Sequence, residues 1–160
     1  MTTIIARFDE DGALSRRLAE AIDMLERPRD LFEVIGQLLE TNIESRFDAK
    51  QDPSGNAWAP LAPSTAERYA RAKTGGTLLE RTRRLRGSLA HNADDSGVDV
   101  GFTPYATEGG RWQIAELHEY GTTRMPRRGL LTADPLTGQL GADDVADIRS
   151  EIERFINGVL

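Results

Sequence analysis

A broad stripe of apolar residues between Asp30 and Phe47 constrains the fold of this chain more than any other feature. The stripe recurs at the spacing of one face of an α-helix, and Asp30 is a plausible N-cap at its start. It predicts a long helix in the N-terminal half, with one face that other parts of the chain must cover. Its members are Leu31, Val34, Ile35, Leu38, Leu39, Ile43 and Phe47.

A similar but shorter pattern occurs before this helix and another at the end of the chain. Apolar residues at helical spacing between Ala13 and Glu26, followed by Pro28, predict a short amphipathic helix, so we expect residues 1–28 to be an N-terminal helical extension. A C-terminal helix is predicted from about Ala142 to Asn157. It has acidic residues in its first turn, as the helix dipole favours, and then a seam of Val145, Ile148, Ile152, Phe155 and Val159. This seam is too short for an independent coiled coil, so we expect it to pack on the domain's own sheet or on a neighbouring subunit.

The segment from Asp48 to Pro63 predicts an ordered loop. Its prolines and Gly55 prevent regular structure, and the large ring of Trp58 needs something to cover it. Ser64 and Glu67 then have the spacing of a capping box, which predicts a short helix that continues to Lys73 and stops at the Gly75-Gly76 pair.

The remaining middle of the chain predicts a small sheet. Thr77 to Leu89 reads as an exposed helix, or as a helix followed by the start of a strand. The alternation in 89–93 and 98–102, with a turn between them, predicts a β-hairpin. Residues 112–120 fit either a strand or a helix, and 127–133 fit another strand. The predicted fold is a single α+β domain over 1–160, with a small, mostly antiparallel sheet flanked by helices.

Composition excludes several classes of protein. The 160 residues include no cysteine, so disulfides, thiolate metal sites and a cysteine nucleophile are excluded. The first residues become acidic before an apolar run reaches the length of a signal peptide, and no stretch approaches about 20 apolar residues, so we expect no membrane contact and a place in the cytoplasm of the cell that makes the protein. The net charge of −6 argues against a general nucleic-acid binder.

The charges are nevertheless segregated along the chain. A cationic stretch runs from Arg68 to Arg86 and includes Arg81-Thr82-Arg83-Arg84-Leu85-Arg86, while Arg124, Arg127 and Arg128 form a second group. Acidic residues collect at Asp94, Asp95 and Asp99 and at Asp143, Asp144 and Asp147. Such separation favours contact between copies or with a partner, and two solvated faces explain it equally well. The arginine run is the best sign of nucleic-acid contact, but no aromatic residue is interleaved to stack on bases.

Residues with catalytic chemistry are sparse. His91 and His118 lack metal-ligand spacing, and neither a nucleophile elbow nor a phosphate-binding loop is present. The carboxylate pairs Asp94-Asp95 and Asp143-Asp144 are explained by a hairpin turn and a helix start. We therefore expect no enzyme activity, no cofactor and no metal.

An ordered series of short motifs resembles the phage virion morphogenesis family, typified by the tail completion proteins of Mu-like and P2-like phages. The series spans about Asp30 to the C-terminus. Its pieces are Pro53-x-Gly55-x-x-Trp58-x-x-Leu61, Leu78-Leu79, Thr82 with Leu85-Arg86-x-Ser88-Leu89, Val100-Gly101, Tyr105-Ala106, His118-x-x-Gly121 and Met125-Pro126-x-Arg128-x-Leu130-Leu131. Two departures stand out: Arg83 replaces the glycine usual after the threonine, and about nine extra residues, 107–115, separate Tyr105-Ala106 from His118.

The resemblance implies a structural role at the junction of phage head and tail. It implies a ring of copies, a hexamer, that caps the tail tube and docks to the head connector in the virion, while DNA passes through its lumen without specific binding. A head-closure connector on the portal side is a close alternative, and a DNA-binding packaging factor a more distant one. The candidate residues for subunit or tail-tube contact are Trp58, Arg83, Arg84, Arg86, Trp112, His118, Arg124, Arg127 and Arg128.

Overall fold

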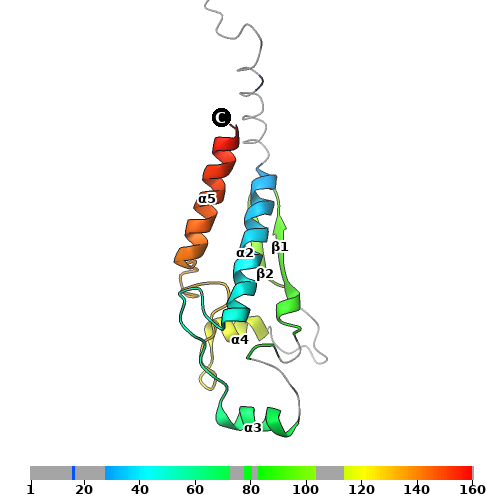
Figure 1. Cartoon of the computed structure of the whole chain (residues 1–160), viewed down its shortest axis with the longest axis vertical. Coiled ribbons are helices and arrows are strands. Elements are labelled where there is room, and N and C mark those ends of the chain that lie inside the picture. Colours follow the sequence, from blue (N-terminus) through cyan, green and yellow to red (C-terminus); the bar gives the residue numbers. More distant parts are fainter. Residues whose placement is uncertain (1–15, 17–27, 73–77, 81–82, 104–113, 160) are drawn as a thin grey trace, which may run out of the picture.

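The computed structural model describes residues 16, 28–72, 78–80, 83–103 and 114–159. Figure 1 shows an elongated molecule in which the long helices and the β-hairpin run side by side, with the short helices at one end. In chain order the elements are α2 (Arg29–Ala49), α3 (Pro63–Arg71), the 3-10 helix η1 (Arg86–Ser88), β1 (Leu89–Ala93), β2 (Val98–Phe102), α4 (Ile114–Tyr120) and α5 (Ala142–Val159). The α+β class predicted from the sequence is confirmed.

Helix α2 is the long helix that the apolar stripe predicts, but its first turn differs from the prediction. Pro28 occupies the N-cap position and Asp30 lies inside the first turn, where its charge faces the positive end of the helix dipole. The helix ends at Ala49 and is capped by Lys50, whose backbone is left-handed (φ 57°) and whose N–H donates to the carbonyl of Arg46.

The predicted hairpin is confirmed, with Leu89 opposite Phe102 and Ala93 opposite Val98. It lies along α2, and the two approach closely at Gly36, which is buried. A Cβ atom added to Gly36 would lie 2.3 Å from Cδ2 of His91 on β1. Both ring nitrogens of His91 also lie close to carboxylates of α2, since Nδ1 is 3.0 Å from Oε1 of Glu40 and Nε2 is 3.3 Å from Oε1 of Glu33.

The hydrophobic core lies where the second half of α2 meets the hairpin and the loops. Phe47 is fully buried there, and its ring makes edge-to-face contacts with Trp58, at a centroid distance of 5.7 Å, and with Phe102, at 6.3 Å. Trp58 is buried, so the expectation that something covers its ring is confirmed. The buried cluster consists of Ile43, Phe47, Trp58, Leu85 and Leu130.

Helix α5 is joined to α2 by polar contacts near its first turn. Asp144 is almost fully buried and forms an ion pair with Arg46, while Asn42 Nδ2 donates to Asp144 Oδ1 at 3.1 Å and to Asp147 Oδ2 at 2.9 Å. The sequence explained the Asp143-Asp144 pair by the helix dipole alone. The structure separates the two residues, since Asp143 is exposed and Asp144 is a tertiary anchor.

Several predicted local structures are wrong. Helix α3 begins at Pro63 with Ala62 at the N-cap and no side-chain cap, so Ser64 and Glu67 form no capping box. A proline at the first helical position needs no capping partner for its own nitrogen, which explains the earlier start. The described residues between Thr77 and Ser88 form turns and the short helix η1 rather than a regular helix, whereas the strand start expected at Leu89 is confirmed. Residues 127–133 are irregular rather than a strand.

One open alternative is resolved by the structure, and several other predictions fall outside the described residues. Of the two possibilities for residues 112–120, the structure contains a helix from Ile114. Apart from Arg16, which is helical, the predicted helix Ala13–Glu26 lies outside the described residues, as do Gly75-Gly76, Trp112 and most of the 107–115 insertion.

The backbone explains what the change from glycine to Arg83 means. Arg83 has φ +53°, in the left-handed region that glycine adopts without steric cost and an L-residue adopts at about 1–2 kcal/mol. Arg83 therefore adopts a backbone conformation that favours glycine, the residue usual at this position of the family motif. An exposed arginine takes the strained position.

We predict that Gly36→Ala destabilises the domain by about 1–3 kcal/mol, because the added methyl group overlaps His91 and this outweighs a gain of about 1 kcal/mol in helix propensity. Chemical denaturation measures the change. Gly158→Ala in α5 is the matched control, since a Cβ there meets open space. Adding His91→Ala to Gly36→Ala should restore stability, and a double variant as unstable as the single one would contradict this explanation.

Candidate assembly surfaces

The carboxylate of Glu119, at the end of α4, holds the loop from Gly121 to Thr132 in place. Its Oε2 accepts the N–H groups of Leu130 (2.7 Å) and Leu131 (3.0 Å), and its Oε1 accepts the N–H (3.0 Å) and the hydroxyl (2.5 Å) of Thr132. Burial raises the pKa of Glu119, but these hydrogen bonds outweigh burial, so the pKa lies below its usual value. A buried, ionised carboxylate thus replaces sheet pairing as the partner of three backbone donors.

Arg127 and Gly121 also hold this loop in place, and we call the hydrogen bonds of Glu119 and Arg127 to it the Glu119 clamp. Arg127 Nε donates to the carbonyl of Glu119 at 2.8 Å, and its Nη2 donates to the carbonyl of Thr132 at 2.6 Å. Gly121 has φ +71°, and a Cβ atom on it would lie 2.9 Å from the backbone nitrogen of Arg127. Only glycine combines this backbone angle with so close a contact, which explains the glycine at this position of the His118-x-x-Gly121 motif.

The same loop is tied to the N-terminal half of the chain by three side chains. Trp58 Nε1 donates to the carbonyl of Gly129 at 3.1 Å, and Arg46 Nη1 donates to the carbonyl of Leu130 at 2.9 Å. In the reverse direction, Arg128 donates from Nε to the carbonyl of Ala59 at 2.8 Å and from Nη2 to that of Pro60 at 2.9 Å. The loop that contains Gly129 and the loop that contains Trp58 therefore hold each other in place.

Arg86 is held within the subunit by carboxylates. Its Nη1 lies 2.6 Å from Asp48 Oδ1 and 3.1 Å from Glu80 Oε1, and Lys50 Nζ lies 2.6 Å from the other oxygen of Glu80. Hydrogen bonds to Asp48 and then to Glu80 raise the pKa of Arg86. These ion pairs join the end of α2 to Glu80 and Arg86. The arginine run that ends at Arg86 is therefore partly engaged in contacts within the subunit.

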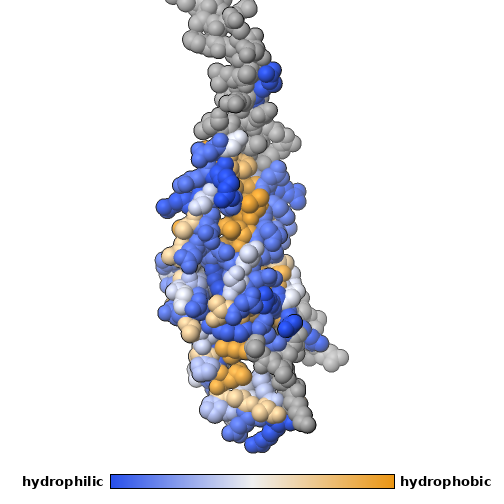
Figure 2. Space-filling view, viewed as in Figure 1, coloured by the Kyte–Doolittle hydropathy of each residue, from blue (hydrophilic) through white to orange (hydrophobic). Residues whose placement is uncertain are grey.

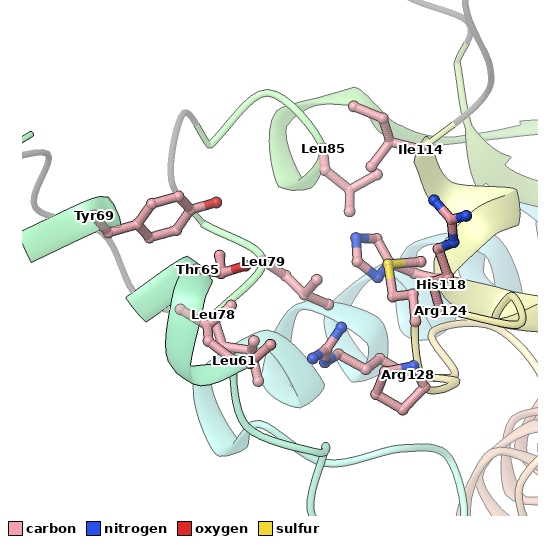
Figure 3. A pocket seen from close by; sticks show the side chains of 13 residues that line it. Leu61, Thr65, Tyr69, Leu78, Leu79, Leu85, Ile114, His118, Arg124 and Arg128 are labelled. Carbon is pink, nitrogen blue, oxygen red and sulfur yellow. The ribbon is translucent and has the colours of Figure 1, made fainter. Parts of the chain in front are cut away.

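A groove opens beside the clamped loop, between α3, α4 and the segment that contains Leu78 and Leu79 (Figure 3). Its volume is about 460 Å³. Most of its wall is apolar, from Leu61, Leu78, Leu79, Leu85, Met125 and Pro126, and His118, Arg124 and Arg128 supply most of its polar groups. We call it the α3–α4 groove.

His118 is uncharged in this groove at neutral pH. Burial, and then the nearby charge of Arg128, lower the pKa of His118 from 6.5 to about 4. Its Nδ1 is buried and has no hydrogen-bond partner among the described residues. With that pKa it is half protonated only well below the pH range in which an unperturbed histidine titrates.

The structure divides the predicted contact residues into three groups. Trp58, Arg86, Arg127 and Arg128 are engaged within the subunit, while Arg83, Arg84 and Arg124 are exposed. His118 lines the groove, and Trp112 lies outside the described residues. His118, Arg124 and Arg128 are the candidates that the fold brings together, and their contacts with other molecules remain predictions.

Sequence reasoning missed Glu119 and Asp144, the two buried acids on which the loop and α5 depend. Neither has a local pattern that distinguishes it from a surface acid. The only available signal for Glu119 was its place between His118 and Gly121 in a family motif.

Groupings typical of metal or membrane proteins are absent from the described parts of the chain. No three His, Asp or Glu side chains there come together as metal ligands. None of the described helices combines the length and apolar character that a membrane crossing requires.

We predict that Glu119→Gln destabilises the domain by at least about 2 kcal/mol, because an amide can accept fewer of the buried N–H groups and places its own donor against them. Urea denaturation at pH 7 measures this change. Glu116→Gln, an exposed position on the same helix, should change stability by less than about 0.5 kcal/mol. Equal effects of the two substitutions would contradict the clamp.

We also predict a pH dependence that His118 dominates between pH 6.5 and 4. Because its pKa is lower in the folded state, its contribution is fully present above 6.5 and declines by up to about 3 kcal/mol as pH falls to about 4. His118→Gln should remove this slope from unfolding free energies measured across the range. His91→Gln is the opposite control: Glu40, and then Glu33, raise the pKa of His91, so its contribution is present below 6.5 and is lost as pH rises through its folded pKa.

Comparison with known proteins identifies the family. The model of the phage virion morphogenesis family matches residues 9–156. A protein of Haemophilus influenzae (strain ATCC 51907 / DSM 11121 / KW20 / Rd), described as Mu-like prophage FluMu G protein 1, is 32% identical over 144 residues, which are 89% of this chain and 86% of the relative. No solved structure matches the chain. This family match extends over the α2 to α5 frame and the Glu119 loop, and the chain is a member of the phage virion morphogenesis family.

Proposed function

We propose that this protein completes the phage tail: it caps the polymerised tail tube and docks it to the head connector. It does so as a structural part of the virion, without catalysis, and as a ring of identical copies, a hexamer. Family membership supports a role in building the particle, and the position in the particle is our inference.

The observation that carries this proposal is how the chain uses its polar and apolar residues. Buried charges such as Glu119, Asp144 and Arg46 brace backbone and helices inside the subunit. Large apolar side chains are left outside: Figure 2 shows them gathered along the line where α2 and α5 lie side by side. Exposed members on these helices are Val34, Val145, Ile152 and Ile156. A rigid subunit with uncovered apolar surface is suited to assembly.

The exposed charges also suit a ring. The acidic turn of the β-hairpin lies at the end of the molecule where α2 begins (Figure 1). Asp94 in this turn is close enough to Arg29, the first residue of α2, for the two charges to interact. The exposed arginines Arg83 and Arg124 lie toward the other end, near η1 and the α3–α4 groove. A closed ring needs two different faces that fit each other, and opposite charges at opposite ends supply such a pair.

A DNA-binding packaging factor is a weaker proposal. It would depend on the arginine run from Arg81 to Arg86, and within this run Arg86 is bound by Asp48 and Glu80. The net charge of −6 instead favours a ring through which DNA passes without being held.

Disrupting the gene in a phage that encodes this chain tests the proposal. We expect filled heads and unattached tails to accumulate, and the intact gene supplied in trans to restore whole particles, as seen by electron microscopy. Immunodetection in separated fractions should find the chain on headless tails of the wild-type lysate. Its presence on tailless filled heads instead would support the head-closure alternative, and its absence from both would refute a place at the junction.

A further inference from the structure

The charge of Arg128 distinguishes the α3–α4 groove from the rest of the described surface. Arg128 is 5% exposed, and among the described residues no carboxylate lies within ion-pair distance of it. Arg46, Arg86 and Arg127 each have such a partner. Burial lowers the pKa of Arg128, which reflects the cost of holding a cation there with only carbonyl partners.

The described residues that line the groove include no carboxylate to compensate this charge. In Figure 3 the side chains of Arg128 and His118 reach toward Leu61 and Leu79 on the opposite wall. Arg124 adds a second cation, and none of the lining residues that the structure describes is Asp or Glu. In a chain with a net charge of −6, this is a cationic site with apolar walls. The matching ligand is a carboxylate next to large apolar side chains.

One segment of this chain has that chemistry. Residues 4–11 read Ile-Ile-Ala-Arg-Phe-Asp-Glu-Asp, so that Ile4, Ile5 and Phe8 are followed directly by three acids. The segment lies outside the described residues. Its apolar residues suit the leucine walls of the groove, and its acids suit Arg124 and Arg128.

The distance between Pro28 and the groove favours a groove on another molecule. Pro28 is the N-cap of α2, and residues 4–11 precede it in the sequence. The groove lies near the other end of α2, whose 21 residues cover about 31 Å, because its residue Leu85 packs with Phe47. Binding in the groove of the same molecule would require the intervening residues to lead back over the whole length of this helix, and binding to another copy does not.

We propose that residues 4–11 of one copy bind in the α3–α4 groove of the next copy, with Asp9, Glu10 and Asp11 facing Arg124 and Arg128. This arm exchange rests on the proposed assembly of identical copies and names one contact within it. It gives each subunit a donating end and an accepting end, as a ring requires.

Disulfide trapping tests the contact in full-length chains, and the absence of native cysteine makes each product unambiguous. One chain carries Ala6→Cys, and a second, with a different tag, carries Ala62→Cys, since Ala62 is exposed and lines the groove. After mixing and mild oxidation, we expect a disulfide between the two chains in at least about tenfold excess over a control that carries Ser150→Cys on α5. Asp9→Asn, Glu10→Gln and Asp11→Asn together, or Arg124→Glu in the accepting chain, should reduce the product to the control level.

Three outcomes would overturn the inference. They are a yield equal to that of the control, a yield unaffected by the charge substitutions, and, in a chain that carries both Ala6→Cys and Ala62→Cys, a disulfide formed only within one chain. Circular dichroism of each variant establishes that it is folded. Immunodetection in particles tests the place at the junction independently, so a chain found there without the trapped disulfide refutes arm exchange alone.

Discussion

The hydrogen bonds from residues 130–132 to the carboxylate of Glu119 are the interaction on which the rest of the structure depends. In the described part of the chain the sheet has two strands, and residues 121–132 do not join it. A buried carboxylate accepts three N–H groups at once, and its negative charge makes each bond stronger than a neutral one. With the loop fixed, the carbonyls of Gly129 and Leu130 can receive Trp58 and Arg46, and Leu130 can enter the core.

This arrangement explains how a chain with little regular structure around its core can be rigid. Arg46 bonds both to the loop and to Asp144 of α5, so the clamp, the long helix and the C-terminal helix share one network. The hydrogen bonds of such a network are hard to break one at a time, because a buried polar group that loses its partner is destabilised by its missing hydration. A subunit braced in this way can leave apolar residues of α2 and α5 at its surface and still keep its shape.

The site could be predicted only in part. The family motifs contain the residues of the groove and of the Glu119 loop. A motif does not show, however, whether its arginine contacts another molecule or a carbonyl of its own chain. Arg128 is buried against Ala59 and Pro60, and Arg86 is bound by Asp48, 38 residues earlier. Arg83 shows the converse: the resemblance marked this position as a departure from glycine, and only the backbone angle showed that Arg83 adopts a conformation that favours glycine.

The sequence by itself determined the elements whose periodicity is local: α2, the hairpin and α5, together with the α+β class and the need to cover Trp58. Tertiary structure decided everything that depends on partners distant in the sequence, such as the burial of Asp144, the clamp at Glu119 and the groove that gathers His118, Arg124 and Arg128. The physical reason is that the spacing of apolar residues identifies the face of a helix or strand that is buried. A single carboxylate or guanidinium does not identify the group that replaces water as its hydrogen-bond partner.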